Sequence, residues 1–153
     1  MNAVPFRVEG PEALPAARTE AVLRRLPSWF GREESLQEYA QHAACLPCFA
    51  IFVQARLVGF ASLRQHFDAA WEIDCLALDP DLHGQGLGRR LLEACEKWLV
   101  AQGASLVQVK TLAATHKSPE YAATRAFYAR MDLLLARKGN ASSARCLMHD
   151  AAA

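Results

Sequence analysis

At 153 residues, with 52% hydrophobic and 22% charged residues, the chain has the size and composition of one compact globular domain. Its 17 basic and 16 acidic residues leave a formal net charge of +1. This balance argues against a nucleic-acid partner, because nucleic-acid-binding domains usually carry a basic excess. Any phosphate group that the protein holds must therefore be held by local geometry.

No stretch approaches the roughly 20 apolar residues that a membrane-spanning helix requires, so no membrane association is expected. The first ten residues, MNAVPFRVEG, lack the basic and apolar regions of a signal peptide. The five cysteines are scattered and odd in number, which favours reduced thiols and a cytoplasmic location. Cys45 and Cys48 have C-x-x-C spacing, but no second pair completes a site, and no metal is expected.

The N-terminal third predicts a short extended segment over residues 3–8, followed by two helices. The first helix is expected over residues 13–26, which are rich in alanine and leucine. The second is expected over about residues 35–44. Ser35 is a candidate N-cap for it, and the alternative is that the two preceding glutamates form its first turn.

Three apolar runs then predict strands. Residues 48–53 and 57–63 are separated by three residues, which suggests a hairpin. Residues 71–78 form the third strand, and Pro80 ends it because proline lacks the N–H that a sheet requires. His66 is expected in a solvated loop.

The remaining sequence alternates between helices and strands. Gly103 stands where a C-terminal helix cap belongs, after an amphipathic run with apolar residues at helical spacing. The expected elements are a helix over 87–100, a strand over 105–111, a helix over 119–131, and closing strands over 133–136 and 143–149. This order predicts a single α/β domain over residues 4–150, in which residues 71–111 form a parallel strand–helix–strand unit.

The chemistry concentrates where the third strand meets the amphipathic helix. Three alternating glycines precede that helix without a gap, in the run His83-Gly84-Gln85-Gly86-Leu87-Gly88. Glycine lets the backbone approach a ligand and adopt positive φ. A helix N-terminus has unpaired amides and a partial positive charge, so a diphosphate is its natural ligand. Arg89 and Arg90 in the first turn could add charge.

Two common nucleotide motifs do not fit this run. A dinucleotide fingerprint requires a glycine where Arg89 stands and an acidic residue near position 108. A Walker loop requires Gly-Lys-Ser/Thr, which is absent. The run resembles instead the acetyl-CoA motif Q/R-x-x-G-x-G/A of GNAT acetyltransferases, with Gly86 and Gly88 at its glycines and His83 at its first position.

The resemblance extends over nearly the whole chain, including Val109-Lys-Thr111 and the segment from Tyr121 to Tyr128. It implies a GNAT fold: a mixed, mostly antiparallel sheet of six to seven strands flanked by about four helices. It implies acetyl-CoA as co-substrate and an amine as acceptor. The backbone of Leu76, Ala77 and Leu78 would bind the pantetheine arm, and His83 to Arg90 would hold the diphosphate. Homodimers are common in that family, and nothing in the sequence decides this.

Amine acetylation needs a proton acceptor near the amine and a donor near the leaving thiol. The resemblance places the donor at Tyr128, in the Phe-Tyr pair. Glu72 and Asp74 are two apart on the third strand, so they share a face and are candidate bases, with ordered water as the alternative. Cys75 is expected to be a core thiol on one face with Ile73 and Ala77, and a covalent acetyl-cysteine route is not expected.

The predicted function is direct transfer of acetyl from acetyl-CoA to an amine of a small molecule. Two alternatives share the same features, namely a protein N-acetyltransferase and a non-catalytic CoA-binding module of the same fold. The acceptor itself cannot be identified from the sequence, because loops and the first two helices build its pocket. Trp29 and Phe30 are candidates for either its wall or the core.

Overall fold

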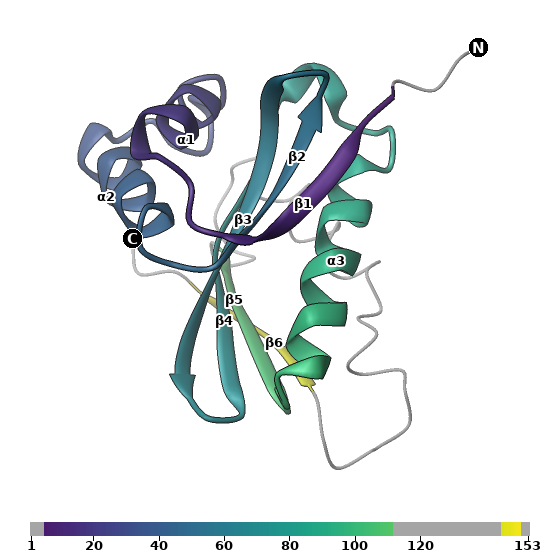
Figure 1. Ribbon diagram of the computed structural model, residues 1–153. Helices are drawn as coiled ribbons and strands as arrows, with labels where there is room; N and C mark the ends of the chain where they lie inside the picture. Colours follow the sequence, from purple (N-terminus) through teal and green to yellow (C-terminus); the bar gives the residue numbers. More distant parts are fainter. Residues whose placement is uncertain (1–4, 112–144, 151–153) are drawn as a thin grey trace.

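The computed structural model describes residues 5–111 and 145–150, which form a mixed sheet with helices on both faces (Figure 1). The strands lie in the order β1-β2-β3-β4-β5-β6. The first four are antiparallel neighbours, and β5 and β6 join them in parallel. Helices α1 and α2 cover one face, and α3 covers the other. A mixed, mostly antiparallel sheet is therefore confirmed.

The described strands are Arg7–Glu12 (β1), Cys48–Val53 (β2), Arg56–Phe67 (β3), Ala70–Leu78 (β4), Leu106–Thr111 (β5) and Arg145–Asp150 (β6). The described α-helices are Ala16–Leu23 (α1), Glu33–Ala43 (α2) and Leu87–Ala101 (α3). The helix and strand predicted over 119–131 and 133–136 lie outside the described residues.

The N-terminal elements differ from the prediction in their limits. β1 begins at Arg7 and runs through Pro11, where the sequence suggested an end. An edge strand tolerates proline because one row of its amides faces no neighbour. Helix α1 begins only after Pro15, whose backbone is extended. Helix α2 begins at Glu33, so its first turn is acidic and Ser35 is not the N-cap.

The centre of the chain follows the prediction closely. β2 and β3 form the expected hairpin, with Gln54 at a positive φ of 56° in its turn. β4 ends where Asp79-Pro80 was expected to end it. β4 and β5 are parallel and are joined through α3. Gly103 closes α3 at a φ of 82°, as a helix-terminating glycine does.

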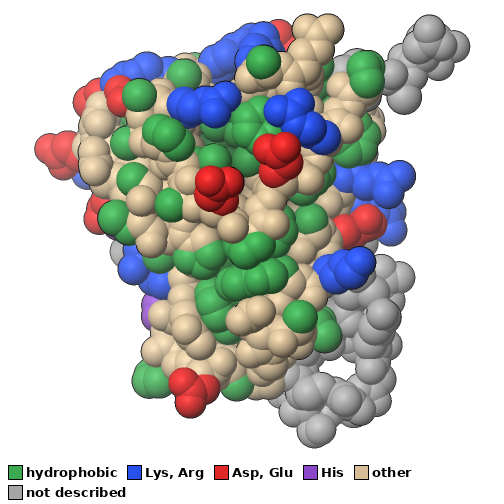
Figure 2. Space-filling model, viewed as in Figure 1, with side chains coloured by type: hydrophobic (Ala, Val, Ile, Leu, Met, Phe, Trp, Pro, Cys, Tyr) green, Lys and Arg blue, Asp and Glu red, His purple; other side chains and the backbone are tan. Residues whose placement is uncertain are grey.

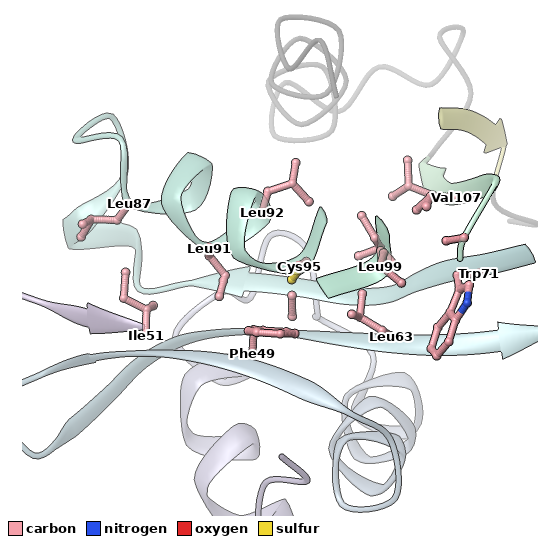
Figure 3. Close-up of a cluster of buried hydrophobic side chains, with 14 of the residues drawn as sticks. Phe49, Ile51, Leu63, Trp71, Leu87, Leu91, Leu92, Cys95, Leu99 and Val107 are labelled. Atoms are coloured by element: carbon pink, nitrogen blue, oxygen red, sulfur yellow. The ribbon is translucent and has the colours of Figure 1, made fainter. Parts of the chain in front are cut away.

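The first hydrophobic core lies between the sheet and α3, and Figure 3 shows its side chains pointing toward one another. Leu91, Leu92 and Cys95 of α3 are fully buried. They pack with Phe49 and Leu63 of the sheet. A second core lies on the opposite face, where α1 and α2 pack on Phe60 and its neighbours. The central strands are therefore buried on both faces, which explains their nearly continuous apolar runs.

A β-bulge interrupts the alternation of β4. Ser62 pairs with Cys75 and Leu63 pairs with Ile73, so Asp74 is an extra residue between the two pairs. Consequently Ile73 faces the α3 side, while Cys75 and Ala77 face α1 and α2. Cys75 is buried as predicted, but its expected placement on one face with Ile73 is wrong because the bulge reverses the alternation.

The core against α3 gives a direct test of packing. Replacing the fully buried Leu91 by alanine should lower the free energy of unfolding by about 2–5 kcal/mol, since a cavity is added to the lost burial. Val100→Ala on the same helix is the control, because Val100 is 47% exposed and should change stability by less than about 0.5 kcal/mol. Urea denaturation measures both, and equal losses would contradict this description of the core.

Candidate functional site

The sheet opens at the bulge, because β4 stops pairing with β5 there. The parallel ladder runs from Ala70 opposite Leu106 to Ile73 opposite Val109. β5 nevertheless continues to Thr111, and its other edge stays paired with β6. Among the described residues, the rest of β4 is bonded to β3 only. A slot, meaning the edge of β4 with which no described strand pairs, therefore begins at Asp74 and includes the backbone of Leu76 to Leu78.

The glycine run begins at His83, after a short turn that follows β4, and leads into α3. Gly84 and Gly86 have φ of 77° and 79°, which L side chains rarely adopt. A Cβ at either position would meet no atom within 4 Å, so the run borders open space. Positive φ sets the backbone of the turn, and the open space leaves room for a ligand against it.

Helix α3 begins at this turn with its amides still available. Its first hydrogen bond runs from the Arg90 N–H to the Gly86 carbonyl, at 3.1 Å. The amides of Leu87, Gly88 and Arg89 precede that bond, and such amides favour an anion. The Leu87 side chain is buried in the core, so this residue can offer a ligand only its backbone. The glycine cradle, meaning residues His83 to Gly88 with the first amides of α3, therefore has the backbone geometry that the sequence predicted, and ligand binding there stays a prediction.

Side chains around the cradle have partners of their own. His83 Nε2 donates to the Leu78 carbonyl at 2.8 Å, so the first residue of the run is bonded to the end of β4. The indole of Trp29 meets the His83 ring edge-on, with centroids 5.8 Å apart. Arg89 Nε donates to Glu93 at 3.1 Å. Trp29 is half-buried against the second core, so it joins that core to the cradle.

Asp79 anchors the turn between β4 and the cradle. Its carboxylate is buried and accepts hydrogen bonds from Arg25 and from Arg56 Nη2, the latter at 2.7 Å. It also accepts from the Asp81 amide at 2.9 Å, which caps the short 3-10 helix Pro80–Leu82 (η1). The hydrogen bond with Asp81 and the charge of Asp79 raise the pKa of Arg25. The cradle is thereby tied to the loop after α1 and to β3.

Glu72 and Asp74 lie on the face that carries α1 and α2, as their spacing predicted, and each has a histidine partner. His66 Nε2 lies 2.6 Å from Glu72 Oε2, and His42 Nδ1 lies 3.0 Å from Asp74 Oδ2. An ionised carboxylate only accepts, so these nitrogens carry the protons. Arg64 Nε is 3.5 Å from Asp74 Oδ1.

The sequence did not indicate the histidine partners. The prediction ended the second strand of the hairpin at residue 63 and placed His66 in solvent, whereas β3 continues to Phe67 and pairs with β4. His66 therefore lies in β3 and not in a loop, but it is exposed as predicted, with its ring beside Glu72. The sequence could have indicated that β3 extends past residue 66, because two antiparallel strands joined by a short turn usually extend over matching lengths. His42 is brought to Asp74 by the packing of α2, which no local pattern shows.

Cys48 and Cys75 do not fit a nucleophilic role. Burial raises the pKa of Cys75 well above its usual value, and burial raises the pKa of Cys48 to about 12. The thiolate is the reactive form, so neither thiol is activated. The described residues contain no group of three or more His, Cys, Asp or Glu that could hold a metal ion.

The surface carries no extended field of one sign on the face shown in Figure 2, where basic and acidic side chains are interspersed. This agrees with the balanced net charge. No helix in the described ranges has the length and apolar character needed to cross a membrane. Tyr128, the predicted proton donor, lies outside the described residues.

The sequence profile of the Acetyltransferase (GNAT) family matches residues 16–132. No curated protein is significantly similar in sequence. Many solved structures share the fold.

One of them is the ribosomal-protein-S18-alanine N-acetyltransferase from Escherichia coli, at 21% identity with a TM-score of 0.67, covering 84% of this chain and 77% of that chain. A GNAT-family acetyltransferase from Streptococcus pneumoniae has 17% identity and a TM-score of 0.61, with coverage of 84% and 87%. N-acetylglutamate synthase from Neisseria gonorrhoeae, solved with coenzyme A and N-acetyl-glutamate, has 22% identity and a TM-score of 0.55 over 78% of this chain and 27% of that chain. The predicted fold is confirmed by these matches.

The anchoring of the cradle can be tested through Asp79. Asp79→Ala should lower the free energy of unfolding by about 1–3 kcal/mol, because three hydrogen bonds to a buried carboxylate are lost. Asp81→Ala is a matched control. Its side chain is 75% exposed although it also pairs with Arg25, so the change should stay near zero. Thermal or urea unfolding measures both, and an unchanged stability of Asp79→Ala would rule out the anchor.

Proposed function

The chain belongs to the GNAT acetyltransferase family, and from this premise we propose that it transfers an acetyl group from acetyl-CoA directly to an amine of a small molecule. The observation that carries the proposal is the continuity of the opened β4 strand with the glycine cradle at the start of α3. Extended backbone followed by a turn of free amides suits a ligand with a long neutral arm and a diphosphate.

The residues present fit acetyl-CoA. Gly84 and Gly86 border open space at positive φ, and the α3 amides precede the first helical hydrogen bond. The backbone of Leu76, Ala77 and Leu78 would hold the pantetheine arm. The diphosphate would be held by the amides of Gly84 to Gly88, with Gln85 within the run and Arg89 and Arg90 beside it, because the His83 N–H already donates to the Pro80 carbonyl at 3.3 Å. When bound, acetyl-CoA supplies an activated acetyl group.

Glu72 is proposed as the base. Its carboxylate is buried on the strand that borders the slot, and the His66 N–H donates to it. That hydrogen bond fixes the orientation of the carboxylate, which would accept the proton that the amine loses as the new C–N bond forms. Asp74 is the weaker candidate, because both of its oxygens face cationic or donor partners, Arg64 and His42. Tyr128 is proposed to return a proton to the leaving thiolate.

A protein amine is the second candidate acceptor. The E. coli ribosomal-protein-S18-alanine N-acetyltransferase, which shares the fold, acts on such an amine. A CoA-binding module without catalysis is the third alternative. Release of free CoA in the presence of a panel of small amines and peptides separates the three, because a non-catalytic module would bind acetyl-CoA and release none.

The cradle assignment can be tested at Gly86. Gly86→Glu should weaken acetyl-CoA binding by about 100-fold or more, because it adds a negative charge where the diphosphate is proposed to lie. Gly103→Glu is a matched control at the other end of α3, since Gly103 has a similar φ of 82° and equally open space. Calorimetric titration with acetyl-CoA measures both affinities. Equal affinities would show that the diphosphate is bound elsewhere.

The proposed base can be tested by comparing two isosteric changes on one strand. Glu72→Gln should lower kcat by about 100-fold while leaving acetyl-CoA affinity unchanged, because it removes the proton acceptor and keeps the shape. Asp74→Asn should lower kcat by less than about 10-fold, since Asp74 is engaged by Arg64 and His42. Steady-state kinetics with an accepted amine decide the matter. A larger loss for Asp74→Asn would transfer the role to Asp74.

A further inference from the structure

Arg64 lies beside the proposed base on the neighbouring strand. The register of β3 and β4 pairs Arg64 directly with Glu72, so the two side chains share a face as closest cross-strand neighbours. That face also carries the contacts of Asp74 with α2. A permanent cation and a candidate base therefore stand next to each other on the side of the sheet that α1 and α2 cover.

The guanidinium of Arg64 is only partly used by the protein. Within residues 5–111 and 145–150 its one polar contact is the ion pair from Nε to Asp74, at 3.5 Å. The two terminal nitrogens form no hydrogen bond there, and the side chain is 34% exposed. Guanidinium presents a planar fork of donors that matches a carboxylate in a bidentate arrangement. Arg64 thus has donors left for a ligand that carries a carboxylate.

The carboxylates of Glu72 and Asp74 are more deeply buried than the Arg64 guanidinium. The side chains of Glu72 and Asp74 are 6% and 9% exposed, against 34% for Arg64. Asp74 is also held by His42, so the carboxylate that orients Arg64 is itself fixed from α2. The site therefore offers the Glu72 carboxylate to an amine and, beside it, the Arg64 guanidinium to an anion. This arrangement is complementary to a molecule that has both charges close together.

We propose that the acceptor is an amino acid or a similar small zwitterion, whose carboxylate binds Arg64 while its amine faces Glu72. This proposal rests on the proposed acetyltransferase function. A simple amine would leave the Arg64 donors without a charged partner, and the N-terminus of a protein would offer an amide in place of the carboxylate. Asp74 and His42 act as positioning residues that hold Arg64 and do not contact the acceptor.

The test compares matched acceptors. Free CoA is measured with wild-type protein, acetyl-CoA and a panel of α-amino acids, the corresponding α-carboxamides, and simple primary amines. The free acids should be preferred over their carboxamides by about 10- to 100-fold in kcat/KM, the value expected for charge-assisted hydrogen bonds. R64Q should abolish that preference through a higher KM for the acids, and R64K should retain part of it. R7Q, with the same charge change on the edge strand β1, should keep the preference.

Each outcome is decisive. Equal use of acids and carboxamides, or an R64Q variant that keeps the preference, overturns the proposal. Turnover confined to simple amines overturns it as well, but leaves the acetyltransferase function in place. No turnover with any amine, although acetyl-CoA binds, removes both. The acid-to-carboxamide comparison needs no variant, so it stands even if R64Q is unstable, which its Tm would show.

Discussion

The extra residue in β4 is the constraint on which the site depends. Because Asp74 is inserted between two cross-strand pairs, β4 changes the face that it shows to each core, and its pairing with β5 ends at the same point. A strand bonded along both edges would leave no backbone group for a ligand. The bulge therefore connects three features: the opened slot, the polar residues before it, and the backbone of Leu76 to Leu78 after it.

The unpaired edge of β4 must also be held in position relative to the glycine run, and Asp79 holds the turn between them. This buried carboxylate accepts hydrogen bonds from Arg25, which follows α1, and from Arg56 of β3. The cradle is thereby held relative to both the helical layer and the hairpin. The shape of the cradle itself is set by local backbone conformation, namely two glycines at positive φ followed by the start of α3. In the proposed function a chain with a net charge of +1 would hold a diphosphate in this way, because the amides act only at short range.

The sequence predicted what depends on neighbours along the chain. Alternating glycines before an amphipathic helix identify the cradle, because the turn and the helix are contiguous. The hairpin and the end of β4 at Pro80 were equally local. What depends on packing was missed: Arg25 lies 54 positions from Asp79, and His42 lies 32 from Asp74. The bulge was missed too, since Ile73, Cys75 and Ala77 alternate perfectly in sequence and only the pairing shows the extra residue.

The two histidine–carboxylate pairs have different consequences because of what else touches each carboxylate. Asp74 is bonded to His42 and paired with the permanent charge of Arg64, so both of its carboxylate oxygens have partners. Glu72 has His66 at 2.6 Å and is the register partner of Arg64. The two carboxylates on one face thus hold different partners. In the proposed function Asp74 orients Arg64 and Glu72 accepts the proton.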